Sequence, residues 1–565
     1  MPTPLGVRAD AGGRGRWRPR IPRTVAWLVR ISAVVAVIDV LRPESELRVF
    51  RPGLLDATLD GVAFALAATT AGVMLLLAGA LQRRKRRAWV LLVAVTSVSV
   101  VAHLRTRDWP VVALNLVVLG MLLWARDDFT AASERTARLA ALRVLLVTGG
   151  VALLGGILLT LRTAPEAAFP RRLTEVLYGL VGFVPDLKFR TSSLSDATTI
   201  ALNAAGALTA LLVLITLLAP ARKPARLSLV DEGRLRDLLD RFGEQDSLGY
   251  FALRRDKTAL FSASGKAAVV HRVVGSVTLA AGDPLGDPEA WPGAIAAWLA
   301  EAERYAWIPG VVGASESGAL AYRRAGLDAL ELGDEAVLDL QRFCLDGRSM
   351  RSVRQAVNRV CRSGYQLDVH RQRELSDAEI TELTRTAEEL RGEEVERGFS
   401  MALGRLGDVA DPDLVIARAR DADGRLVAVL AFVPWGRDGL SLDLMRRAGD
   451  SQNGTMEYVV AGVVAWAREQ GLRRMSLNFA AFRSVFERGS RVGAGPVLRV
   501  WRRVLLLASG WWQIESLYRA NVKYAPEWAP RFVCFRRASD LPRVAVAALQ
   551  AEALLVRPRL RWLAR

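Results

Sequence analysis

This 565-residue sequence has little of what metal and redox chemistry require, because it contains only three cysteines and three histidines. Cys344, Cys361 and Cys534 form no C-x-x-C pair, and no histidine lies at ligand spacing from them. The sequence therefore predicts neither a zinc site nor a disulfide framework, and we expect no bound metal. Three thiols of this kind suit a reducing cytosol.

A glycine-rich turn that could hold a pyrophosphate in front of a helix is also lacking. The nearest candidate is the stretch RVGAG at residues 491–495, whose glycine spacing is poor. This absence argues against an acetyl-CoA-dependent acyltransferase, which we keep as an alternative. We expect the chain to use no cofactor.

Acidic residues are too few to balance the basic ones. The sequence has 77 Lys and Arg against 58 Asp and Glu, a formal net charge of +19. Polyanions are the expected neighbours of such a chain, either anionic lipid headgroups or nucleic acid. With 51% hydrophobic residues, the chain is too apolar for an ordinary soluble protein, so we expect a membrane part and a globular part.

Apolar segments with few internal charges occupy the first 220 residues. Several are close to the minimum of about 20 residues that a membrane span needs. The scarcity of charge inside them argues against a transport path, although Arg30 and Arg143 near segment ends keep a lipid transporter or flippase as an alternative. We predict about six spans, at residues 25–41, 61–81, 88–103, 110–124, 139–161 and 198–219.

Basic residues flank these segments mainly on one side. They occupy the amino-terminal tail, the loops 83–87 and 126–138, and the segment 222–226. By the positive-inside rule this side is the cytoplasm, so both termini and all residues after 220 are predicted to be cytosolic. No small-x-small cleavage site follows the first segment, so we do not interpret it as a signal peptide.

After residue 220, short β-type runs alternate with amphipathic helices in two comparable blocks. This pattern predicts an α/β or α+β fold with an internal duplication. The predicted division is a basic tail (1–24), a membrane domain (25–220), two α/β subdomains (221–345 and 346–540) and a second basic tail (541–565).

A helix predicted at residues 350–363 gathers arginines on one face. At helical spacing they fall within an arc of roughly 140°, and valines lie opposite. Such a face suits the phosphates of tRNA or of lipids, although a solvated face without a ligand has the same pattern. The candidate phosphate-binding residues are Arg351, Arg354, Arg359 and Arg362.

The next candidates lie on a helix predicted to begin at Asn453 and to end at Gly471. Asn453 is a suitable N-cap, and glycine commonly follows a helix end. Asn453 and Glu457, four residues apart, neighbour each other along the buried stripe and are candidates for substrate binding. Alternatively, Glu457 only complements the helix dipole.

Asp443 lies on a predicted strand whose Leu440, Leu442 and Leu444 point to the opposite face. An acid among so many apolar residues usually has a partner or a function. Arg446 would fall on the other face, so the two can share a site only if the strand ends or bulges near Met445.

Lys523 precedes Pro526 and Pro530, which should end a helix and fix the backbone that follows. It is either a site residue or an ordinary surface ammonium group.

Six stretches together resemble the phosphatidylglycerol lysyltransferase family, also called multiple peptide resistance factor. They occur in matching order over most of residues 228–540. The stretches are GDPLGD (282–287), MRSVRQAVNRVCRSGY (350–365), ERGFSMALGR (396–405), SLDLMRR (441–447), NGTMEYVVAGVVAWA (453–467) and SLYRANVKYAPEWAPRF (516–532).

The resemblance implies a tandem pair of acetyltransferase-like (GNAT-like) folds behind a helical membrane domain. Members transfer an aminoacyl group, most often lysyl, from aminoacyl-tRNA to the glycerol hydroxyl of phosphatidylglycerol at the cytoplasmic face of the bacterial cell membrane. The product lowers the negative charge of the membrane and gives resistance to cationic antimicrobial peptides. The expected partners are therefore aminoacyl-tRNA, phosphatidylglycerol and the membrane.

The resemblance also implies roles for single residues. In the family, the Asp and Arg of the DLMR motif and the Lys of the last motif line the substrate tunnel, and these match Asp443, Arg446 and Lys523. The family often has Asp where this chain has Glu457. As substrate-binding residues we predict Asn453, Glu457, Asn478, Tyr524 and Arg531.

Two features depart from other members. Longer members carry further spans that form a lipid flippase, so about six spans predict no flipping here. Some relatives carry a fused lysyl-tRNA synthetase, whereas the basic tail 541–565 leads us to expect a separate synthetase. The sequence does not specify the amino acid, because lysine, alanine, ornithine and arginine use similar frameworks.

Overall fold

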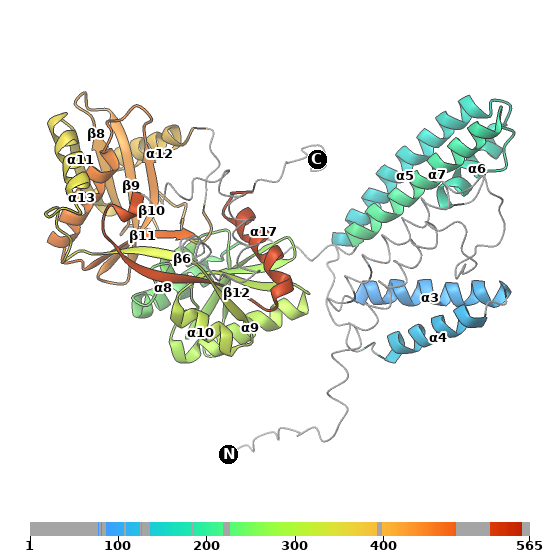
Figure 1. The fold of residues 1–565 in the computed structure, drawn as a ribbon, viewed down its shortest axis with the longest axis horizontal. Helices are drawn as coiled ribbons and strands as arrows, with labels where there is room; N and C mark the ends of the chain where they lie inside the picture. The colour runs from blue at the N-terminus through green and yellow to red at the C-terminus, as the bar shows by residue number, and fades with distance from the viewer. Residues whose placement is uncertain are drawn as a thin grey trace, which may run out of the picture. The chain divides into compact units, whose positions relative to one another are not determined.

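The computed structural model of the chain describes residues 77, 81, 86–106, 109–124, 126, 136–182, 185–217, 226–392, 398–481 and 520–555. The chain forms two compact units, the first mainly residues 1–222 and the second mainly residues 223–565. Figure 1 shows the first unit as helices and the second as a mixed sheet with helices on both sides.

Most described residues of the first unit are helical. Two of its helices contain stretches long and apolar enough to cross a membrane, Leu139–Thr163 and Leu194–Leu217. The predicted spans 88–103, 110–124 and 139–161 fall on helices, as does the described part of 198–219, residues 198–217. The span 25–41 and nearly all of 61–81 lie outside the described residues. The number of about six spans stays a prediction. The helices are α3 (Arg86–Thr106), α4 (Trp109–Trp124), α5 (Thr136–Thr163), α6 (Phe169–Val181) and α7 (Ser192–Leu217).

One twelve-stranded sheet organises the second unit. Its strands follow the order β1-β2-β3-β5-β12-β6-β11-β10-β9-β8-β7, and β4 pairs with β2. The strands are β1 (Thr258–Phe261), β2 (Ala267–Val274), β3 (Val277–Ala281), β4 (Leu285–Gly286), β5 (Ile308–Ala314), β6 (Asp328–Asp339), β7 (Gln366–Arg371), β8 (Val415–Arg420), β9 (Leu426–Trp435), β10 (Gly439–Arg447), β11 (Arg474–Ala481) and β12 (Glu527–Phe535).

Helices cover both faces of this sheet. Figure 1 shows α11 and α13 side by side on one face of β8–β10 and α12 on the other. On α11, the buried residues Val353, Ala356 and Val360 recur at helical spacing, so this face packs and the arginine face does not. The helices are α8 (Leu229–Phe242), α9 (Trp291–Arg304), α10 (Glu316–Arg324), α11 (Arg351–Arg362), α12 (Asp377–Arg391), α13 (Thr455–Glu469) and α17 (Leu541–Ala551), with the 3₁₀ turn η3 (Gly249–Leu253).

The two halves of the sheet repeat one motif and then exchange strands. In each half a strand, a helix and a second, parallel strand follow one another, as β3-α9-β5 and as β10-α13-β11. The next strand of the first half, β6, pairs with β11 of the second half, and β12 returns to pair with β5. Since β6 and β12 also pair with each other, the halves form one sheet. The predicted subdomain boundary at residue 345 stays a prediction.

A buried charge network lies where the exchanged strands meet. Arg531 of β12 donates from Nε to Glu335 Oε2 of β6 (2.9 Å) and from Nη1 to Asp246 Oδ1 (2.7 Å). Its Nη2 also donates to Ser247 Oγ (2.6 Å). Burying a guanidinium is tolerable only when its donors are paired in this way. The network therefore ties both halves to the segment in front of η3.

We expect Arg531→Ala to lower the free energy of unfolding by about 3–5 kcal/mol, because the carboxylates of Glu335 and Asp246 would be left buried and unpaired. The matched control is the exposed Arg342→Ala, whose partners are Glu527 and Asp339 at the surface; it should cost less than about 1 kcal/mol. Denaturant unfolding of the purified protein, followed by tryptophan fluorescence, measures both. Equal losses in the two variants would show that the network does not hold the halves together.

Candidate functional site

The parallel strands β10 and β11 separate into a fork. They pair only from Gly439 to Ser441 with Arg474 to Ser476. Directly beyond these pairs both strands become irregular, β10 between Leu442 and Leu444 and β11 between Ser476 and Phe479. Such irregularities free backbone groups and redirect side chains, and they are common beside active sites. We call the divergence of residues 442–447 from residues 477–481 the fork.

Asn478 bridges the fork at its base. Its Nδ2 donates to the Leu442 carbonyl oxygen (2.7 Å), which the bulge frees. Its φ of +67° is left-handed, a strained conformation that asparagine tolerates better than most residues. Its Oδ1 is buried and has no hydrogen-bond partner among the described residues. This predicted substrate-binding residue therefore has an acceptor available at the fork.

Hydrogen bonds through Ser476 fix the backbone of Asn478. Its N–H donates to Ser476 Oγ (3.1 Å), and the Ser476 hydroxyl donates to Glu335. Glu335 is the partner of Arg531, so the charge network supports the strained residue. Sequence reasoning missed Glu335 and Ser476, because β6 contains five acidic residues and nothing in its sequence distinguishes Glu335 from the others.

Asp443 occupies the bulge of β10. Its Oδ1 accepts a hydrogen bond from the Leu403 backbone N–H (2.6 Å). The predicted placement of Leu444 beside Leu440 and Leu442 is wrong. Leu442 pairs with Phe432 and Leu444 with the adjacent Ala431, so the extra residue turns Leu444 to the opposite face.

The same bulge changes the position of Arg446. Ser441, Leu444 and Arg446 pair with Val433, Ala431 and Val429, which alternate along one face of β9. Leu403, the partner of Asp443, belongs to the core cluster that contains Val433. The strand does bulge before Met445, so Asp443 and Arg446 lie on the same side of the sheet.

Lys523 and Glu457 form an ion pair across 66 residues of sequence. Lys523 Nζ lies 2.8 Å from Glu457 Oε1, with side chains 43% and 15% exposed. Glu457 lies in the first turn of α13, where it also faces the positive end of the helix dipole. Its specific partner is Lys523. Asn521 Nδ2 donates to the Leu477 carbonyl (3.4 Å) and attaches this segment to β11 beside Asn478.

Tyr524 is buried in the core between the sheet and α13. Burial raises the pKa of its hydroxyl, and the nearby Glu457 carboxylate raises it further. Tyr524 therefore stays neutral at physiological pH.

The predicted N-cap of α13 is wrong. Gly454 is the N-cap, with φ +104°, and Asn453 precedes it with an exposed side chain. A Cβ on Gly454 would lie 2.8 Å from the Ala356 Cβ of α11, so close helix packing requires glycine there. The predicted helix end is confirmed, because Gly471 has φ +75° directly after the last turn.

The arginines of α11 divide into two groups. Arg351, Arg359 and Arg362 are exposed. Arg354 is partly buried and donates to the carbonyls of Leu345 and Gly347, which holds the turn before the helix. Three of the four predicted phosphate-binding residues thus form a basic surface, and Arg354 has a structural role.

Arg531 is not at the fork surface. Its three nitrogens are engaged by the buried partners described above, so its position does not support the predicted contact with substrate.

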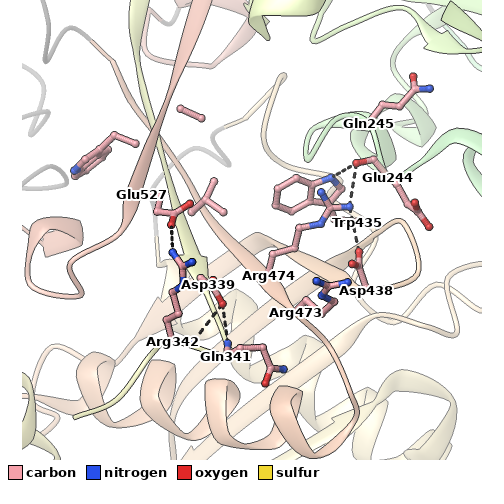
Figure 2. A pocket seen from close by; sticks show the side chains of 13 residues that line it. Glu244, Gln245, Asp339, Gln341, Arg342, Trp435, Asp438, Arg473, Arg474 and Glu527 are labelled. Atoms are coloured by element: carbon pink, nitrogen blue, oxygen red, sulfur yellow. Dashed lines mark hydrogen bonds and ion pairs between the residues drawn. The ribbon is translucent and has the colours of Figure 1, made fainter. Parts of the chain in front are cut away.

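A groove of about 840 Å³ lies at the other ends of β10 and β11. Figure 2 shows Arg474 between Trp435 and Asp438. Arg474 stacks on the Trp435 ring at 4.0 Å, pairs with Asp438 at 3.1 Å and donates to the Glu244 carbonyl at 3.0 Å. Its charge is therefore already satisfied, and none of the predicted site residues lines this groove.

In the first half, the place that corresponds to the fork is filled. Asp283, after β3, accepts hydrogen bonds from the Ser315 N–H (2.8 Å) and hydroxyl (2.5 Å) at the start of α10. A Cβ on Gly318 would lie 1.9 Å from Asp283 Oδ1, so the carboxylate fits only against glycine. The GDPLGD turn thus supplies an internal carboxyl group to the start of this helix.

Asp283 should make stability depend on pH. Burial, and then the neighbouring Asp246 carboxylate, raise its pKa from an ordinary 3.8 to about 7. The folded state therefore binds more protons than the unfolded state between these values. This contribution to stability is complete below about pH 4 and is lost as the pH rises through about 7.

We expect Asp283→Asn, which removes this titration, to reduce the fall in melting temperature between about pH 5 and about pH 8. Asp413→Asn is the control, because its carboxylate lies in an exposed pair with Arg373 and should leave the slope unchanged. An unchanged slope in Asp283→Asn would assign the pH dependence to other groups.

Fold and site define a protein with an apolar helical amino-terminal unit and a mixed α/β carboxyl-terminal unit, which contains strand–helix–strand repeats and a forked parallel pair. A sequence profile described as "Phosphatidylglycerol lysyltransferase, C-terminal" matches residues 236–535. A second, described as "Transmembrane region of lysyl-tRNA synthetase", matches residues 17–219. The chain belongs to the phosphatidylglycerol lysyltransferase family.

Individual relatives support the same family. "Lysylphosphatidylglycerol biosynthesis bifunctional protein LysX" of Mycobacterium marinum is 45% identical over 511 residues, covering 86% of this chain and 45% of that protein. Its namesake in Rhodococcus opacus is 42% identical over 576 residues, covering 99% of this chain and 51% of that protein. The chain therefore spans about half the length of these relatives.

The solved structure of L-PGS from Bacillus licheniformis is similar in fold, with a TM-score of 0.51 and 22% identity. The match covers 60% of this chain and 99% of that one.

Proposed function

We propose that this protein transfers a lysyl group from lysyl-tRNA to a glycerol hydroxyl of phosphatidylglycerol. The observation that carries the proposal is the fork, where Asn478 joins β11 to β10 beside the bulge that holds Asp443, within the segment that matches the family. The Lys523–Glu457 pair lies at the first turn of α13, the helix that connects the two strands of the fork. The name of the relatives, lysylphosphatidylglycerol biosynthesis protein, supports the same product.

The reaction is the exchange of one ester for another. The glycerol oxygen forms a bond to the acyl carbon, the bond from that carbon to the tRNA ribose oxygen breaks, and a proton moves from the glycerol hydroxyl to the ribose. The donor ester is already activated, so orientation, proton removal and oxyanion stabilisation suffice. No cofactor is needed for these steps.

Each residue at the fork has a role in this scheme. Asp443 pairs with the α-ammonium of the donor or orients the glycerol hydroxyl. Arg446 and Lys523 bind phosphate or stabilise the negative charge that develops on the tetrahedral oxygen. Asn478 Oδ1, Asn453 and Glu457 hydrogen-bond the aminoacyl end, and Glu457 keeps Lys523 in position through their 2.8 Å contact.

The basic surface of α11 receives the donor. Arg351, Arg359 and Arg362 are exposed on one helix face, and guanidinium groups bind phosphate oxygens in sequence-independent contacts. Such contacts position the acceptor end of tRNA and make its binding sensitive to salt.

We place the reaction at the cytoplasmic face of a multi-pass membrane domain of about six spans, as the distribution of basic residues predicts. The product carries a cationic headgroup, so the membrane becomes less negative and attracts cationic antimicrobial peptides less. Donor supply by a separate lysyl-tRNA synthetase and the absence of lipid flipping stay predictions from the sequence.

Asp443→Asn should abolish transfer, because a neutral amide cannot pair with an ammonium group or accept the hydroxyl proton. We would express the full chain in a phosphatidylglycerol-containing bacterium and identify its lipids by mass spectrometry. The wild type should produce lysyl-phosphatidylglycerol, and the control Asp413→Asn should match it. Full activity of Asp443→Asn would exclude the role given to this carboxylate.

Lys523→Met separates catalysis from stability. The partly exposed ion pair should contribute no more than about 1 kcal/mol to folding, whereas loss of an oxyanion or phosphate contact should lower transfer about 10²-fold or more. Transfer assays with purified lysyl-tRNA, beside melting temperatures, test this. A variant that loses stability and activity in proportion would make Lys523 structural.

A further inference from the structure

Three apolar side chains of the second unit project into solvent far more than its other described large hydrophobic residues. Val409 is 93% exposed, Leu229 85% and Val230 74%, whereas the next, Leu320 and Val546, are each 44% exposed. Single exposed apolar residues are ordinary, but a contiguous group marks a surface that binds an apolar partner.

These residues lie on two adjoining segments. Leu227, just before Leu229, donates its N–H to the Arg255 carbonyl (3.0 Å). The side chain of the same Arg255 pairs with Asp408 (2.6 Å), next to Val409. One arginine thus joins the start of α8 to the loop that carries Val409. We call Leu229, Val230 and Val409 the apolar edge.

A buried charge network holds the apolar edge rigidly. Arg405, almost fully buried, pairs with Glu232 of α8 (2.8 Å) and with Asp411 (2.7 Å). Arg236 of α8 pairs with the same two carboxylates, each at 2.8 Å. Buried ions of this kind require close pairing. The loop is therefore clamped on both sides of Val409, which is itself left in solvent.

The chain itself indicates what covers this edge. The polypeptide enters α8 directly after the apolar run 198–219 and the basic residues Arg222, Lys223 and Arg226. Exposed Arg226 and Arg255 flank the apolar tips. Apolar tips bordered by arginines fit an anionic lipid surface, because the tips enter the headgroup region and guanidinium groups meet lipid phosphates.

We propose that the apolar edge is the surface by which the second unit docks on the bilayer. The segment that carries Val409 also includes Leu403, whose N–H binds Asp443 of the fork. Docking therefore holds one end of this segment in the lipid surface and the other end at the fork. The inference goes beyond the proposed reaction and requires only a membrane.

Depth-dependent fluorescence tests the docking directly. The full chain, with Cys344→Ser and Cys361→Ser, receives one cysteine at residue 409, 229 or 230, labelled with an environment-sensitive fluorophore. It is reconstituted in vesicles of equal phosphatidylglycerol and phosphatidylcholine with nitroxide-labelled lipid. Labels at the apolar edge should lose about half or more of their fluorescence. Control labels at residues 320 and 546 should change little.

A polar variant provides the second readout. Leu229→Ser combined with Val409→Ser should lower transfer to phosphatidylglycerol in vesicles about tenfold and leave transfer to detergent-dispersed phosphatidylglycerol unchanged. The control Leu320→Ser should behave as the wild type on both.

Two fluorescence results would overturn the proposal. Labels quenched equally by aqueous iodide at all sites would show that the edge stays in water, and labels shielded from both quenchers would show that protein covers it. Failure of the proposed reaction would remove the transfer readout and leave the quenching result intact.

Discussion

The pairing of Arg531 with Glu335 is the interaction on which the rest of the second unit depends. Since β6 and β12 cross between the halves, their contact lies at the centre of the sheet, where an unpaired charge would be costly. Glu335 also accepts the Ser476 hydroxyl, and Ser476 holds the strained Asn478. The same buried pair therefore joins the halves and shapes the fork.

The two halves contain the same strand–helix–strand motif, but different groups lie beyond its parallel strands. In the first half, Asp283 fills the start of α10 with an internal carboxylate. In the second half, two strand irregularities open the fork, and the nearby polar groups come from β10, β11, α13 and the 521–523 segment. The two halves therefore share a strand–helix–strand frame but differ at the ends of their parallel strand pairs.

The segment from Gly398 to Asp411 connects three parts of this frame. The carboxylate of Glu552, directly after α17, binds the N–H groups of Phe399 and Ser400. Asp443 binds Leu403, and α8 clamps the end of the segment through Arg405. A segment fixed at three points can hold the Asp443 side chain in one defined position.

The sequence by itself determined the division into membrane and globular parts, the basic face of α11, the end of α13 at Gly471 and the family, because these depend on composition, local spacing and ordered motifs. It also indicated most residues of the fork. Only the tertiary structure decided that Asp443 lies in a bulge, that Gly454 caps α13, that Lys523 meets Glu457 and that Arg531 is buried. Each of these depends on contacts between segments distant in sequence, where one added residue or one close approach reverses what local periodicity predicts.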